Sequence, residues 1–179
     1  FNVAAIAIGS DGKIAIAGSR YDGSELQFMA GRLLSDGSFD PAFDADGHIT
    51  TPFGPGNDRA HSVVFQPDGK IVAAGYQANG SNTDFAVVRY NSDGSLDTTF
   101  DSDGIVTTPG GPIDDTASSI AIDSIGRLVV AGSSGGDFAL ALYTANGSLD
   151  TTLGGDGIIT VDFNVSRDRA NAMALDEKG

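Results

Sequence analysis

Stretches of the form Asp-x-Asp-Gly are the clearest candidates for chemistry in this chain. Two such stretches occur, and a third, related stretch keeps only the second aspartate. Carboxylates at alternate positions before a turn glycine are typical of the middle of a calcium-binding loop, because hard oxygen ligands suit Ca²⁺ and glycine permits the sharp turn. The candidate Ca²⁺ ligands are Asp44, Asp46, Asp101, Asp103 and Asp156.

The calcium pattern is incomplete, so a second interpretation stays open. Ala42 and Thr99 occupy the position of the first ligand, and no Glu follows where the last ligand of such a loop would stand. Asp-Gly pairs also form tight turns without any metal. Calcium is therefore the only cofactor that the sequence suggests, and turn formation is the alternative.

The sequence suggests no catalytic residue. Residues 132–136, GSSGG, match the letters of a nucleophile elbow, but both histidines, His48 and His61, precede that stretch, whereas the motif needs a later one. We interpret 132–136 as a short hairpin loop and the histidines as surface residues. Arg32 and Arg89 occupy equivalent sites in the first two copies of a repeat, and we interpret them as charges on an edge strand.

Candidate recognition residues lie in the part of the repeat whose length varies. The variable loop covers 19–27, 76–84 and 133–137, and length variation in a repeat array concentrates on one face. Tyr21 and Tyr76 could contact a sugar or a protein there. Three sequons of the form Asn-x-Ser are candidates for glycosylation, and their asparagines are Asn79, Asn146 and Asn164.

These stretches recur because the chain is a tandem repeat. The turn glycines Gly12, Gly69, Gly126 and Gly179 are 57, 57 and 53 residues apart, and AFDADGHITT, TFDSDGIVTT and TLGGDGIITV align without a gap. A fixed period of this length indicates a repeat architecture. We expect repeats at 1–60, 61–117 and 118–170, with 171–179 as the first strand of a fourth.

Each repeat contains four short segments rich in Val, Ile, Phe, Tyr and Thr, which predicts an all-β fold. In the second repeat the expected strands are 61–66, 70–75, 84–90 and 104–108. Four strands in about 55 residues are typical of one blade of a β-propeller, so we expect four-stranded antiparallel blades, about three plus one strand. The second strands are apolar on both faces and should lie between neighbouring blades or near the axis. The alternative architecture is an open β-solenoid.

The composition of the chain excludes several classes of partner and of structure. Among 179 residues, 24 are acidic and 10 basic, for a formal charge of −14, which argues against nucleic acid. Cysteine is absent, so disulfides and thiolate metal sites are excluded. No apolar run approaches the roughly 20 residues of a membrane span. Three blades do not close a ring, so we expect a piece of a longer protein, or association of several copies.

The stretches RYNSDGSLDTTFDSDGIVTT and DDTASSIAIDSIGRLVVAG resemble the bacterial delta-60 repeat. The resemblance covers essentially the whole chain and implies propeller-forming repeats in large surface or secreted bacterial proteins of uncharacterised activity. We therefore expect a non-catalytic extracellular scaffold or interaction module that contacts protein, carbohydrate or further copies of itself. The alternative is a segment of a propeller hydrolase or lyase whose catalytic residues lie outside this stretch.

Overall fold

The computed structural model describes residues 1–164 and 167–176, and over these residues it is an all-β structure without helices. Twelve strands form three four-stranded antiparallel sheets, one for each repeat, as predicted. Each sheet is a meander in which consecutive strands pair. The first sheet holds β1 (Asn2–Ile8), β2 (Ile14–Tyr21), β3 (Leu26–Leu33) and β4 (His48–Thr51); the second holds β5 (Arg59–Phe65), β6 (Ile71–Ala78), β7 (Thr83–Tyr90) and β8 (Ile105–Thr108); the third holds β9 (Asp115–Ile122), β10 (Leu128–Ser134), β11 (Asp137–Tyr143) and β12 (Ile158–Val161).

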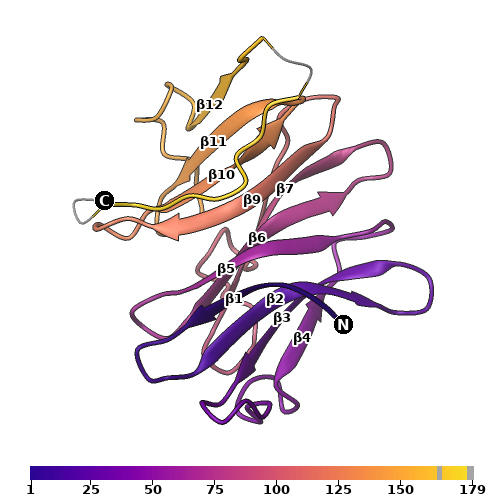
Figure 1. Cartoon of the computed structure of the whole chain (residues 1–179), viewed down its shortest axis with the longest axis vertical. Helices are drawn as coiled ribbons and strands as arrows, with labels where there is room; N and C mark the ends of the chain where they lie inside the picture. The colour runs from indigo at the N-terminus through magenta and orange to yellow at the C-terminus, as the bar shows by residue number, and fades with distance from the viewer. Residues whose placement is uncertain (165–166, 177–179) are drawn as a thin grey trace.

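The three sheets pack face to face, one above the other (Figure 1). The first strand of each later sheet lies on the sheet before it: β5 contacts β1, β2 and β3, and β9 contacts β5, β6 and β7. This arrangement is that of neighbouring propeller blades, and none of the three sheets closes on itself. It differs from a solenoid of parallel coils, because every pairing between strands is antiparallel.

Two apolar cores fill the two interfaces between sheets, which we call seams. β6 divides its side chains between them: Ile71 and Ala73 belong to the seam with the first sheet, whereas Val72 and Ala74 belong to the seam with the third. Alternating side chains of a strand point to opposite faces, so a strand covered on both sides must be apolar at every position. The prediction that the second strands lie between blades is confirmed for β6, whereas β2 and β10 each have a described sheet on one side only.

The hairpin after the second strand of each sheet accounts for the different repeat lengths. In the first two sheets four residues, 22–25 and 79–82, join the paired strands, whereas Gly135 and Gly136 alone join β10 to β11. The β10–β11 pairing is also one residue pair shorter, so this hairpin has four residues fewer in total. Both glycines have positive φ angles, which a two-residue hairpin turn requires. The stretch 132–136 is therefore a strand end and a tight turn, as interpreted from the sequence.

Residues 171–179 do not form the predicted strand in their described part, 171–176. In the three sheets the first strand pairs with the second strand of its own repeat, and the described residues include no such second strand beside 171–176. The preceding residues nevertheless follow the expected path, since the backbone N–H of Ala170 donates to Gly132 O at 3.0 Å. Two sheets also begin slightly before the predicted boundaries, β5 at Arg59 and β9 at Asp115.

Across the described residues there is no apolar helix of the length that spans a bilayer.

Candidate functional site

The aspartates predicted as calcium ligands lie in exposed turns and mostly bond to their own backbone. Asp46 Oδ1, Asp103 Oδ1 and Asp156 Oδ1 accept the backbone N–H two residues later, at 3.1, 2.9 and 3.0 Å. Within the described ranges, no three side chains of the predicted set come close enough together to share an ion. Calcium binding by these residues stays a prediction, and their observed contacts are those of turn formers.

Asp44 and Asp101 have a conformational role in the same turns. Their φ angles are 49° and 47°, in the left-handed region that Asp tolerates better than most residues. The third repeat has Gly154 at the equivalent position, with a φ of 64°. Backbone geometry thus explains why Asp and Gly exchange at this position without reference to a metal ion.

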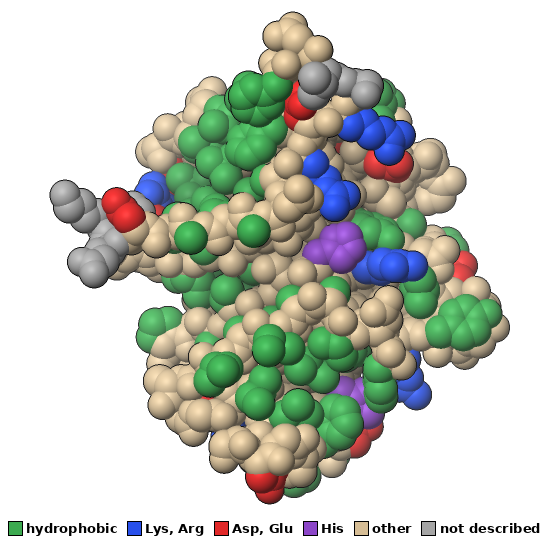
Figure 2. Space-filling model, in the orientation of Figure 1, with side chains coloured by type: hydrophobic (Ala, Val, Ile, Leu, Met, Phe, Trp, Pro, Cys, Tyr) green, Lys and Arg blue, Asp and Glu red, His purple; other side chains and the backbone are tan. Residues whose placement is uncertain are grey.

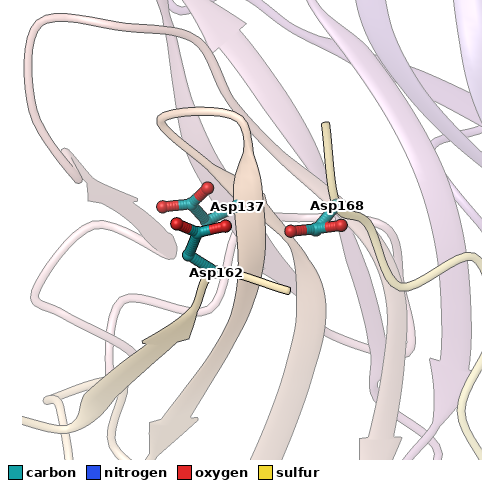
Figure 3. Close-up of side chains that lie close together, drawn as sticks. All are labelled: Asp137, Asp162 and Asp168. Carbon is teal, nitrogen blue, oxygen red and sulfur yellow. The ribbon is translucent and has the colours of Figure 1, made fainter. Parts of the chain in front are cut away.

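Three other carboxylates do come together. Ligand atoms of Asp137, Asp162 and Asp168 all lie within 4.8 Å of one another, and no further group of this kind occurs in the part of the chain that the structure describes (Figure 3). Asp168 Oδ2 also accepts the backbone N–H of Phe163 at 2.8 Å. The sequence analysis did not identify this group.

Asp168 belongs to a recurring set of buried aspartates that the sequence analysis missed. Asp58, Asp115 and Asp168 are 57 and 53 residues apart, the same intervals as the turn glycines. Asp58 Oδ1 accepts the N–H of Ala78 at 2.8 Å, and Asp115 Oδ1 accepts that of Gly135 at 3.1 Å, so each holds the hairpin of the next repeat along the chain. Repeat register would have revealed this set. It indicates a structural role for Asp168.

Arg32 and Arg89 are buried and connect neighbouring sheets, which corrects their interpretation as edge-strand charges. Only 4% and 5% of their surfaces are exposed. Arg32 Nε donates to Asp40 Oδ2 at 2.8 Å, and its Nη1 donates to Ser92 O of the second sheet. Arg89 repeats this arrangement with Asp97 and Ala145 O of the third sheet. A buried charge needs such partners, and they lie in a different repeat, which the sequence alone did not reveal.

The paired aspartates remain ionised well below neutral pH. Burial opposes the charge on Asp40, but hydrogen bonds from the backbone of Ala42 and from Lys13 and Arg32 outweigh it and lower its pKa to about 2. Burial also opposes the charge on Asp97, and hydrogen bonds from Lys70 and Thr99 together with the Arg89 guanidinium hold its pKa well below the usual range. Each seam between described sheets therefore contains a permanent ion pair.

A tyrosine and a threonine form a second polar link in each seam. The hydroxyls of Thr51 and Tyr90 lie 2.6 Å apart between the first and second sheets, and Tyr143 donates to Thr108 at 2.8 Å between the second and third. Both tyrosines are buried, and burial raises the pKa of Tyr143 to about 12. The hydroxyl of one sheet thus depends on its neighbour for a partner.

The residues at the two outer ends of the stack lack these links. In the third repeat, Leu142 replaces the arginine and Val161 replaces the threonine; in the first repeat, Leu33 replaces the tyrosine. Asp150 pairs instead with Arg127 of its own sheet, at 3.2 Å. The faces that have no neighbouring sheet in the structure are therefore apolar where the internal seams are polar.

The tyrosines proposed for recognition lie in different surroundings. Tyr21 is exposed at the end of β2, and its hydroxyl donates to Gly23 O in the hairpin loop at 2.9 Å. Tyr76 is half-buried and its ring packs against His61 at 5.4 Å, so burial raises its pKa. Burial also lowers the pKa of His61, whose Nδ1 lies 3.1 Å from Ala117 O, so this histidine is partly buried beside the third sheet.

The three sequon asparagines are exposed in turns. Asn79 Oδ1 accepts the backbone N–H groups of Ser81 and Asn82, and Asn146 Oδ1 accepts that of Ser148. Asn164 is described, but Ser166 of its sequon lies outside the described residues. Local turn bonds account for the first two side chains, and glycosylation stays a prediction for all three.

An apolar surface on the first sheet is the strongest candidate for an interaction site. Val3, Ile6 and Ile8 of β1 pair with alternate residues of β2 and so lie on one face, and the β1 partner of Leu33 across β2 is Ile8. Hydrophobic side chains gather over the first sheet in Figure 2. We call this surface the open face, and it consists of Val3, Ile6, Ile8, Leu33 and Phe39.

The same positions are covered in the other two repeats. Ile6 is 66% exposed, whereas Val63 and Ile120, at the equivalent positions, are each 4% exposed because a preceding sheet lies on them. Val3 is exposed and its counterparts Ala60 and Ala117 are buried. The open face thus corresponds to surfaces that a preceding sheet covers in the second and third repeats.

Comparison with known families agrees with this architecture. Residues 9–43, 66–100 and 126–153 match the model of the family described as "Domain of unknown function (DUF5122) beta-propeller", and the chain belongs to this family. The expectation of a propeller-forming repeat of unknown function is confirmed, while the narrower delta-60 name stays a prediction. No curated protein matches the chain.

Among solved structures, the chain is similar to Sqt1 from Chaetomium thermophilum, with 14% identity and a TM-score of 0.30. The match covers 80% of this chain and 44% of that one.

Proposed function

We propose that this chain is a non-catalytic scaffold or interaction module that binds a protein partner through the open face. The open face carries the proposal, because the positions it exposes are the ones that neighbouring sheets cover elsewhere in the same chain. An apolar surface of this kind, on a soluble domain, is typical of an interface.

Two further parts of the proposal depend on the family resemblance and composition. We propose an extracellular or cell-surface location in a bacterium, and partners that are protein or carbohydrate rather than nucleic acid, since the formal charge is −14. The absence of cysteine is compatible with an oxidising compartment, because no thiol can be mispaired there.

Photo-crosslinking in the producing cells tests the proposed function. A photoreactive amino acid at Ile6 should give a covalent adduct with a protein identifiable by mass spectrometry. Ile125 is the matched control, because it is equally exposed, at 74% against 66%, but lies in a turn of the third repeat. Adducts at Ile6 and none at Ile125 support the proposal. No protein adduct at Ile6, or equal adducts at both sites, would contradict it.

A further inference from the structure

We infer that the open face of one chain binds the outer face of the third sheet of a second copy, head to tail. This inference rests on the proposed function and names the partner of the same surface. The outer face of the third sheet is the one that corresponds to the covered faces of the first and second sheets, and it carries Leu140, Leu142, Ile159 and Val161.

The two outer faces match each other in polarity at the position where each internal seam has a hydroxyl pair. Val161 occupies the position of the threonines, Thr51 and Thr108, in these hydrogen bonds. Leu33 occupies the position of the tyrosines, Tyr90 and Tyr143. Stacking the third sheet of one copy on the first sheet of another therefore brings valine to leucine and leaves no hydroxyl unpaired. Both members of this pair are apolar.

Mismatched stacking would be penalised. If the outer face of the third sheet met a sheet with tyrosine, as the second and third sheets have, Val161 would leave that hydroxyl buried without a partner. If the open face met a sheet with threonine, Leu33 would leave the threonine hydroxyl buried without a hydrogen-bond partner. The substitutions thus favour contact between the two ends and disfavour any other register.

The outer face of the third sheet is also apolar at the position where the first two repeats have a buried arginine. Arg32 and Arg89 each donate across a seam to a carbonyl of the next sheet, and Leu142 cannot. Leu142 is itself buried. A head-to-tail contact would therefore be more apolar than either internal seam, and it would need no ion pair at its centre.

Residues 168–176 occupy part of the outer face of the third sheet and must be exchanged for β1 of the second copy. Two backbone bonds hold them there, Asp168 N to Gly136 O at 2.7 Å and Ala170 N to Gly132 O at 3.0 Å. In repeat register Met173 corresponds to Ile6 and Ala170 to Val3, so the two segments compete for one position. Figure 1 shows this C-terminal segment crossing the third sheet.

Sedimentation equilibrium of the chain of residues 1–179 at concentrations up to about 1 mM tests the inference. The wild type should associate reversibly and Ile6→Lys should remain monomeric, whereas Ile125→Lys should behave as the wild type. Met173→Asp, which weakens the competing segment, should strengthen association several-fold. Leu33→Tyr should weaken it about tenfold, and Leu33→Tyr combined with Val161→Thr should restore it by recreating the hydroxyl pair.

The outcomes separate this inference from the proposed function. Association that Ile6→Lys abolishes but that Met173→Asp and the Leu33/Val161 exchange leave unchanged would overturn the head-to-tail contact in favour of two open faces meeting. Monomers throughout, for the wild type and for Met173→Asp, would overturn self-association. In both cases the crosslinking at Ile6 decides separately whether the open face binds some other protein.

Discussion

The first and second sheets present the same face in two different environments. Both have small and branched apolar residues on the first three strands, but Val63 is covered by the first sheet and Ile6 by nothing that the structure describes. Exposure of Ile6 therefore does not reflect a polar, surface-adapted sequence. Each repeat carries half of two interfaces, and whether a side chain is core or surface depends on its neighbour.

The largest expected effect comes from placing a charge at the same repeat position in both environments. Val63→Lys should lower the free energy of unfolding by about 4 kcal/mol, because an ammonium in the seam has no partner. Ile6→Lys should change it by no more than about 0.5 kcal/mol. Urea unfolding of both variants measures the difference, and similar losses at both positions would contradict the account.

The buried ion pair distinguishes the internal seams from the outer faces. Arg89→Leu introduces the residue of the third repeat into the second and should cost about 3 kcal/mol, because buried Asp97 then keeps Lys70 as its one cationic partner among the described residues. Arg20→Leu, on the exposed part of β2, is the control and should be nearly neutral. A neutral Arg89→Leu in urea unfolding would show that the link between sheets is dispensable.

Acid should weaken the first seam through Asp40. The pKa of Asp40 in the folded state is about 2, below the value of about 3.9 in an unfolded chain, so its contribution is complete above pH 5 and disappears as the pH falls through 2. The loss from this group is about 2 kcal/mol. Asp40→Asn should flatten that part of a stability curve measured from pH 5 to pH 2. If Asp40→Asn left the loss of stability between pH 5 and pH 2 unchanged, Asp40 would not be its cause.

The hydrogen bond between the tyrosine and threonine hydroxyls is a smaller difference between the internal seams and the outer faces. Tyr90→Phe leaves Thr51 buried without its partner and should cost about 1–2 kcal/mol. Tyr90→Phe with Thr51→Val removes both polar groups, as the pair Leu33 and Val161 does, and should recover most of the loss. Thermal unfolding of the single and double variants tests this coupling. Additive losses would show that the two hydroxyls do not act together.

The smallest effect concerns the turns in which the first and third repeats differ. Ala45 has a φ of 61°, where Gly155 stands in the third repeat, so Ala45→Gly should stabilise the chain by about 0.5–1 kcal/mol by removing strain. The melting temperature of this variant should rise slightly. A fall would mean that the side chain contributes more than the backbone strain costs.

The sequence predicted the features that one repeat specifies by itself. Turn glycines, apolar second strands and the varying hairpin are local patterns, and they recur in register, so the sheets and the seams followed from them. In the second repeat, the expected strand 84–90 appears as β7, Thr83–Tyr90. The terminal segment was predicted less well, because a strand requires a pairing partner as well as a suitable sequence.

Contacts between repeats were the features that sequence reasoning missed. Arg32 looked like a surface charge because its acceptor, Ser92 O, is 60 residues away and is a backbone atom without a sequence signature. Asp58 was overlooked although it recurs as Asp115 and Asp168, since its partners are backbone N–H groups. The open face could have been recognised only by knowing which neighbour covers each sheet.

Because the chain has no cysteine, disulfide trapping tests the central claim most directly. A chain carrying Leu33→Cys is mixed with a chain carrying Val161→Cys under mild oxidation, and disulfide-linked dimers are separated by mass, with one chain tagged. Stacking of the third sheet of one copy on the first sheet of another predicts that mixed dimers form faster than either homodimer. Homodimers of Leu33→Cys alone, or no disulfide at all, would contradict it.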